Sequence, residues 1–129
     1  MSSILPAIIS TATVAMVPYP VYTALIPDNS PLPYAVVMLL GSNLEYTVGN
    51  IYIETAQFQV SVWHTTLAGA ESLSQTVDFA FNRKYFASNV IECDKTSYVI
   101  PPVEVADQII TYGAILNYSV LYQRYVTTG

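Results

Sequence analysis

The period of the hydrophobic pattern changes inside one stretch of the chain, FQVSVWHTTLAGAESLSQTVDFAF at residues 58–81. Apolar and polar residues alternate up to Val62, as in a strand that buries one face. From Thr66 onward the apolar residues recur at helical spacing. A chain with this change of period must hold both a sheet and a helix, and the helix is expected to pack on the apolar face of the strand.

The strand before this change is long. Its expected core face comprises Tyr52, Ala56, Phe58, Val60 and Val62, and its opposite face comprises Thr55, Gln57, Gln59 and Ser61. Gly49 and Asn50 interrupt the run NLEYTVGNIYIETAQFQVSVW and predict a bend or a hairpin. One side of the strand is therefore expected in the core, and the other is polar or contacts a partner.

The helix is expected to begin at Thr65 or Thr66, because a threonine hydroxyl can accept a hydrogen bond from the first helical N–H groups. Its expected apolar stripe comprises Thr66, Ala70, Leu73, Val77, Ala80 or Phe81, and Lys84. Residues expected largely outside the stripe are Glu71, Ser74, Gln75 and Asp78. The acids toward the start, with Arg83 and Lys84 at the end, follow the order that the helix dipole favours.

The first 40 residues predict a helix, an extended connection and a strand. The run ILPAIISTATVAMV reads as a short, mostly buried helix with Pro6 in its first turn and apolar positions Ile4, Ile8, Ile9, Ala12 and Ala15 or Met16. It lacks the positive region of a secretory signal and the length of a membrane span. Five of the eight prolines follow in VPYPVYTALIPDNSPLPY, which predicts an extended connection. A buried strand, YAVVMLL, is then expected to end at a turn in GSN.

The last third of the chain predicts strands around 89–92 and 97–100, an irregular return through PPVEVADQ, and a closing strand, AILNYSVLYQRYV. The expected core face of the closing strand comprises Leu116, Tyr118, Val120 and Tyr122. These elements together predict a single domain over residues 1–129. Its fold is expected to be α+β, with a mainly antiparallel sheet of about four or five strands and helices packed on one face.

The charges argue against a protein that grips nucleic acid. The formal net charge is −5, and no Lys or Arg occurs before Arg83, whereas five of the nine acids do. Four cations make a poor phosphate-binding patch, so sequence-specific nucleic-acid binding is not expected. Charged residues are only 10% of the chain, so much of its surface must be neutral or apolar, as on proteins that partners cover. The 11 tyrosines suit either such contacts or a tyrosine-rich core.

No residue pattern predicts a catalytic, cofactor or metal site. His64 and Cys93, the only residues of their kinds, show no local signature of a nucleophile with its base, so His64 is expected to cap or pack locally beside Trp63. Glu92 and Asp94 could touch a hard cation or form a solvated edge. A single cysteine excludes an intramolecular disulfide and fits a reducing cytosol. The chain is therefore not expected to be an enzyme.

The order of these elements resembles the tail completion, or tail terminator, family of long-tailed bacteriophages and related prophages. The residues that carry the resemblance are Val21, Tyr22, Pro33, Tyr34, Val36 and Val37, then Gln59, Val60, Ser61, Val62 and Trp63, then Ala70, Glu71 and Leu73. The family resemblance implies a small α+β subunit of a homo-oligomeric ring, commonly of six. That ring stops polymerisation of the tail tube protein and then meets the head–tail connector protein.

The resemblance also implies location in the virion, after assembly in the host cytoplasm and without a membrane or a cofactor. The alternatives are another virion structural protein, such as a connector or a capsid decoration protein, and at low weight a small enzyme using His64. The residues expected at contacts are Tyr22, Asp28, Asn29, Pro31, Pro33, Tyr118, Tyr122 and Arg124. The acidic balance would suit a ring whose lumen passes DNA, because like charge opposes phosphate binding. This expectation fails if Glu45, Glu54, Asp78 and Glu92 all lie on the outer rim of the ring.

Overall fold

The computed structural model describes residues 4–23, 31–106 and 109–125, and their fold is α+β. The described helices are α1 (Leu5–Met16) and α2 (Leu67–Phe81), and the strands are β1 (Val21–Tyr22), β2 (Tyr34–Val48), β3 (Ile51–His64), β4 (Val90–Val99), β5 (Glu104–Ala106) and β6 (Ile109–Tyr125). The sheet order is β1-β2-β3-β6-β4, and β5 pairs with β6. The β1–β2 pair is parallel, and the other pairs are antiparallel.

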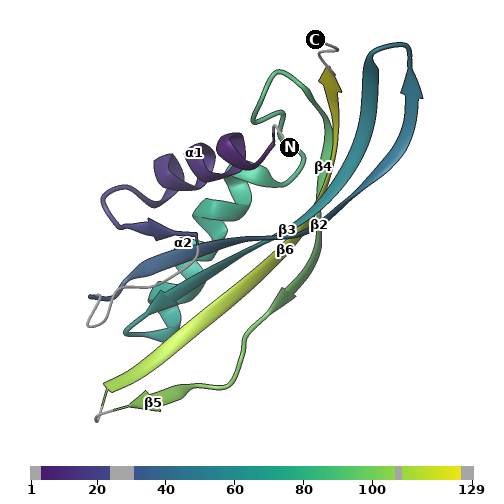
Figure 1. Cartoon of the computed structure of the whole chain (residues 1–129). Helices are drawn as coiled ribbons and strands as arrows, with labels where there is room; N and C mark the ends of the chain where they lie inside the picture. The colour runs from purple at the N-terminus through teal and green to yellow at the C-terminus, as the bar shows by residue number, and fades with distance from the viewer. Residues whose placement is uncertain (1–3, 24–30, 107–108, 126–129) are drawn as a thin grey trace.

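The sheet has six strands, more than the four or five expected. The additional elements are β1 and β5, of two and three residues, which are too short to leave a periodic pattern in the sequence. Both helices lie on the same side of the sheet, over its middle (Figure 1). At one end the β2–β3 hairpin projects beyond the helices, and at the other end β5 and the start of β6 do so. The helices therefore cover only part of a long sheet.

The core lies between the helices and the middle of β3 and β6. The β3–β6 pairing runs without a register shift from Ile51↔Tyr125 to His64↔Tyr112. As predicted, the alternate residues of these strands are fully buried; they are Ala56, Phe58, Val60 and Val62 on β3 and Leu116, Tyr118, Val120 and Tyr122 on β6. The Phe58 ring stacks on Tyr118 and meets Phe81 of α2 edge-on. Tyr52, expected on the same core face, is only half-buried.

Helix α1 confirms the predicted helix, but it is not mostly buried as expected, because one face lies in the core whereas Val14 is 73% exposed. Pro6 lies in its first turn, and Ile8, Ala12 and Met16 are buried. The connection after α1 contributes β1, and the peptide bonds Val17–Pro18 and Leu32–Pro33 are cis. In the part of the chain that the structure describes, no helix is long and apolar enough to cross a membrane.

The predicted turn at GSN is wrong, because β2 continues through it to Val48. Gly41 pairs with Gln57 and Ser42 with Ala56, and the irregularity is a bulge between Leu39 and Gly41. The chain reverses instead at the predicted site, Gly49 and Asn50, where Gly49 adopts a φ of 61°. Only glycine takes this left-handed conformation at no steric cost. The strands expected at 89–92 and 97–100 are likewise one strand, β4, with two bulges.

Helix α2 begins where predicted and ends earlier. The Thr66 hydroxyl accepts a hydrogen bond from the Gly69 N–H at 3.0 Å. The helix ends at Phe81, so Arg83 and Lys84 lie beyond its last turn and no acid lies in its first turn, contrary to the expected dipole order. Ser74, expected outside the apolar stripe, is fully buried. Its hydroxyl is satisfied there because it donates to the Glu71 carbonyl oxygen at 2.7 Å.

Candidate interaction surfaces

The end of the sheet that the helices leave uncovered is strongly apolar. We call it the arm: β5, the first residues of β6, and the Val99–Val103 segment that leads into β5. Val105 is 68% exposed and Ile109 58% exposed, and Val99, Ile100, Val103 and Ile110 are also exposed. Three residue pairs, from Glu104↔Thr111 to Ala106↔Ile109, hold β5 on β6. Removing such side chains from water lowers the free energy, so the arm is suited to contact with another molecule.

A second apolar surface is a groove between α1 and α2, which we call the helix groove. It encloses about 450 Å³, and residues that line it include Val14, Ala15, Phe79, Ala80 and Phe86. Phe79 is 75% exposed and Val14 73% exposed. The Lys84 ammonium nitrogen lies 4.3 Å from the centre of the Phe79 ring, at the rim of the groove. Ser10, Thr11 and Thr76 also line the groove, so its lining is largely apolar, with a cation nearby.

The bare face of the sheet, opposite the helices, is mixed in character. It carries polar pairs across the strands, with Gln57 donating to the Ser119 hydroxyl at 3.1 Å and Asn117 donating to the Ser97 hydroxyl at 2.8 Å. A concavity of about 400 Å³ on this face is lined by the carboxylates of Glu45, Glu92 and Asp94 among others. In the described residues, no group of three or more His, Cys, Asp and Glu side chains is placed to hold a metal ion.

Two of the four cations, Lys95 and Arg124, form close ion pairs with carboxylates of the same subunit. Arg124 donates through Nε to Glu54 Oε1 at 2.9 Å and through Nη2 to the same oxygen, while the Tyr122 hydroxyl donates to Glu54 Oε2 at 2.6 Å. These contacts, above all the Arg124 hydrogen bond, lower the pKa of the Glu54 carboxyl. Lys95 pairs with Asp78 Oδ2 at 3.1 Å. The ion pairs therefore leave few cations for contacts outside the subunit.

The acid Asp78 also accepts a hydrogen bond from the Tyr118 hydroxyl at 2.9 Å, so this cluster ties α2 to β4 and β6. Burial and this hydrogen bond raise the pKa of Tyr118. The four acids considered for the lumen, Glu45, Glu54, Asp78 and Glu92, are therefore not equivalent. Glu54 and Asp78 are engaged on the helix side of the sheet, whereas Glu45 and Glu92 share the concavity of the bare face.

The predicted contact residues are divided among different environments. Tyr118 and Tyr122 are fully buried, so the expectation that they meet a partner is corrected: their rings fill the core and their hydroxyls reach internal carboxylates. Tyr22 is half-buried, edge-on to the Tyr34 ring at 5.7 Å. Pro31 is exposed, and Pro33 and Arg124 are half-buried. Asp28 and Asn29 lie outside the described residues.

His64 closes β3 and serves the local structure. Its Nδ1 accepts a hydrogen bond from the Thr66 N–H at 3.3 Å. Its ring lies so close against Gly69 that a Cβ atom at that position would come within 2.6 Å of ring atoms. The neighbouring Trp63 ring covers Gly113 in the same way. The predicted role of His64 as a local cap is confirmed.

Cys93 is not placed or ionised for nucleophilic chemistry. It pairs with Val120, which pairs with Ala56, and His64 is eight positions further along β3. At about 3.3 Å per residue this separates the two residues by roughly 26 Å, too far for a thiol and its base. Burial raises the pKa of the thiol to about 12, so it stays protonated at neutral pH.

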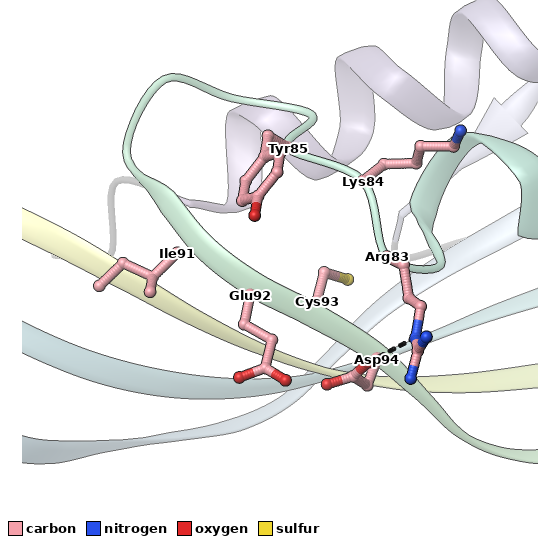
Figure 2. Close-up of a pocket in the computed structure, with 7 residues that line it drawn as sticks. All are labelled: Arg83, Lys84, Tyr85, Ile91, Glu92, Cys93 and Asp94. Atoms are coloured by element: carbon pink, nitrogen blue, oxygen red, sulfur yellow. Dashed lines mark ion pairs between the residues drawn. The ribbon is translucent and has the colours of Figure 1, made fainter.

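The hollow next to Cys93, of about 380 Å³, also lacks a catalytic arrangement (Figure 2). Arg83 points toward Asp94, but their closest atoms are 3.8 Å apart and both side chains are well exposed, so the pair contributes little. A hydrogen bond with Asp94 raises the pKa of Glu92. Lys84 also lines the hollow, but its ammonium group points away from Glu92 and Asp94. The hollow is therefore an exposed, mostly polar surface, and the thiol that lines it, Cys93, stays protonated at neutral pH.

Sequence reasoning missed the arm and the helix groove. The sequence signal for the arm is IPPVEVADQII at 100–110, where apolar residues prevail and the charged residues are all acids. The two prolines in this stretch instead favour the prediction of an irregular return. The groove depends on how α1 and α2 pack together, and Val14 and Phe79 read individually as ordinary members of amphipathic helices.

Comparisons with known proteins support the fold. No protein-family model matches the chain, and no curated protein matches its sequence. Among solved structures, the chain is similar to one from a structure described as the virion of a native gene transfer agent particle. The TM-score is 0.53 and the sequence identity 16%, over 95% of this chain and 87% of that one. At this identity the likeness shows a shared fold.

Proposed function

We propose that the protein is a non-enzymatic virion assembly protein, a tail terminator or tail completion subunit. In this proposal it forms a homo-oligomeric ring of six that caps the tail tube and joins it to the head–tail connector protein. The observation that carries the proposal is the fold shared, over nearly the whole chain, with a component of a gene transfer agent virion. The ring assembles in the host cytoplasm and remains in the virion.

The surfaces of the molecule support a role in assembly. The arm and the helix groove are two apolar surfaces on different parts of one subunit, as contacts between successive subunits of a ring require. The acids of the bare face, Glu45, Glu92 and Asp94, suit a lumen through which DNA passes, because like charge opposes phosphate binding. The proposed contacts with the tube or the connector are Tyr22, Pro31, Pro33 and Arg124, together with Asp28 and Asn29 between them in the sequence.

The test is polymerisation of the cognate tail tube protein with and without this protein, followed by negative-stain electron microscopy. We expect rings with a central hole, bound at one end of each tube, and tubes that stop growing. His64→Ala should assemble and cap as the wild type does, because His64 acts only in local capping. Tubes that grow unchanged, with no ring at their ends, would contradict the proposal.

The alternative is another virion structural protein, a connector or a capsid decoration protein. The same fold likeness supports it, because the description of the related structure refers to the whole virion. Pull-down against purified tail tube, connector and capsid proteins separates the two. A terminator binds the tube and the connector, whereas a decoration protein binds the capsid alone.

A further inference from the structure

We propose that the arm of one copy seats in the helix groove of a second copy of this chain, with Glu104 next to Lys84. This inference rests on the proposed function in that it identifies the contact that closes the ring. The oligomeric state tests the contact and binding to tail tubes tests the proposed function, so each can fail separately.

Both surfaces are exposed and lie apart on the subunit. Figure 1 shows β5 at one end of the sheet, whereas α1 and α2 cover its middle. The pairing of β5 with β6 holds the arm in place at the end of the sheet. The arm of a subunit is therefore directed outward, and the groove that receives it belongs to a neighbour.

The shapes and side chains of the two surfaces match. Val105 pairs with Ile110, so two branched apolar side chains project from one face of the two-stranded arm. The groove provides about 450 Å³ between two helices, lined by Val14, Phe79 and other apolar residues together with three hydroxyl-bearing residues. A ridge of branched side chains placed between two helices removes apolar surface of both partners from water.

The charges match as well, and they select the partner. Residues 96–123 contain no Lys or Arg, and the charged residue of β5 is Glu104. The residues that line the groove are all uncharged, and its nearby cation is Lys84. Lys84 forms no ion pair with any residue in the described ranges, whereas Arg83, Lys95 and Arg124 each lie near a carboxylate.

An arm paired with a second arm would bring Glu104 against Glu104, and a groove paired with a groove would bring Lys84 against Lys84. Only the arm-to-groove contact joins opposite charges. Because it uses two different surfaces, the contact is heterologous. Repeated contacts of this kind close into a ring when the rotation between subunits allows it.

Two variants, one on each surface, test the contact. Val105→Asp places a charge on the arm, and Phe79→Asp places one in the groove. Each variant alone should be monomeric by size-exclusion chromatography with light scattering, under conditions in which the wild type forms an oligomer. Met38→Asp, a charge at another exposed apolar position, on the bare face, is the matched control and should leave the oligomer intact.

Mixing the two variants gives the decisive result. Phe79→Asp keeps an intact arm and Val105→Asp keeps an intact groove, so the mixture should form a 1:1 dimer that cannot grow. A charge exchange adds a second measurement: Glu104→Lys and Lys84→Glu should each weaken association roughly 3-fold to 10-fold, and the double variant should restore most of it. Urea unfolding of every variant checks that the subunit is folded.

Several results would overturn the contact. These are a wild type that stays monomeric at its highest soluble concentration, oligomers that persist in Val105→Asp and Phe79→Asp, and folded monomers of the two variants that do not pair when mixed. Oligomers that persist in both variants and still cap tail tubes would reject this contact and leave the proposed function standing. A 1:1 dimer of the mixed variants, from a protein that never binds tail tubes, would support the contact and reject the proposed function.

Discussion

Strand β6 passes through two environments that differ in what covers them. From Leu116 onward, side chains such as Leu116 and Tyr118 are buried under α2 and against β3. In its first residues, Ile109 and Ile110 are equally apolar but exposed, because the helices do not reach that end of the sheet. The comparison teaches that apolar content marks both a core and a contact surface, and that only the position of the covering elements separates them.

The polar groups of the two halves differ as well. Under the helices, the buried hydroxyls of Tyr118 and Tyr122 each have a carboxylate partner. Such pairing is required where water is excluded, since an unpaired buried polar group costs about 1–3 kcal/mol. On the arm, Glu104 is exposed to solvent and stays available to a partner.

The largest expected effect is the loss of a ring from the covered half. Phe58→Ala should lower the free energy of unfolding by about 3–5 kcal/mol, because the ring packs against Phe81, Phe86 and Tyr118 and leaves a cavity when removed. Urea unfolding monitored by circular dichroism measures the change. Ile109→Ala on the arm is the control, expected within about 0.5 kcal/mol of the wild-type monomer. Equal losses at both positions would break the comparison.

The ion pair between Glu54 and Arg124 predicts that the stability of the fold depends on pH. The Arg124 hydrogen bond lowers the pKa of Glu54, so its contribution to stability is present above the ordinary value of 4.5 and is lost as pH falls through the lower folded-state pKa. Glu54→Gln should be less stable than the wild type at pH 7, and the difference should shrink toward pH 3. Urea midpoints over this range test it, and a constant difference would contradict the assigned cause.

The cap of the covering helix predicts a smaller change. Thr66→Ala should cost about 1 kcal/mol, because the hydroxyl that accepts from the Gly69 N–H is lost. Thr65→Ala is the matched control and should change the unfolding midpoint much less, since within the described residues the Thr65 hydroxyl has one long hydrogen bond, with His64 Nδ1 at 3.4 Å, and caps no helical N–H. Equal effects of the two substitutions would show that the cap lies elsewhere.

The last prediction concerns the chemical reactivity of Cys93 in the native protein and requires no change in stability. Burial raises the pKa of its thiol to about 12, so the native protein should resist a thiol reagent at pH 8 and react only when unfolded in urea. Ser97→Cys introduces an exposed thiol on the same strand and should react at once. Rapid labelling of native Cys93 would show that β4 opens readily from the covered sheet.

The elements with strong periodicity were predictable from sequence. The alternation of β3 and β6 identified their buried faces, and Thr66 marked the start of α2 because capping is a local interaction. The continuation of β2 through GSN was not predictable from sequence. Gly41 and Ser42 pair with β3 there, and this tertiary pairing overrides the local preference for a turn. The two segments of β4 were joined for the same reason.

The candidate surfaces were less accessible to sequence reasoning. Tyr118 was correctly placed on a core face yet also expected at a contact, because the sequence does not show that Asp78, 40 residues away, receives its hydroxyl. Glu54 and Arg124 are brought together only by the register of β3 with β6. The exposure of Val105 depends on where the helices end over the sheet, which no local pattern encodes.

The bulges of β2 and β4 have a further consequence for how copies of the protein can meet. Beyond its short pairing with β1, the outer edge of β2 is regular only over Val37–Leu39, Gly41–Leu44 and Tyr46–Val48, and β4 is similarly divided. A straight strand from another chain could match either edge for three or four residues before losing register. Growth into amyloid-like stacks by strand addition is therefore disfavoured, and assemblies of finite size through side-chain surfaces are favoured.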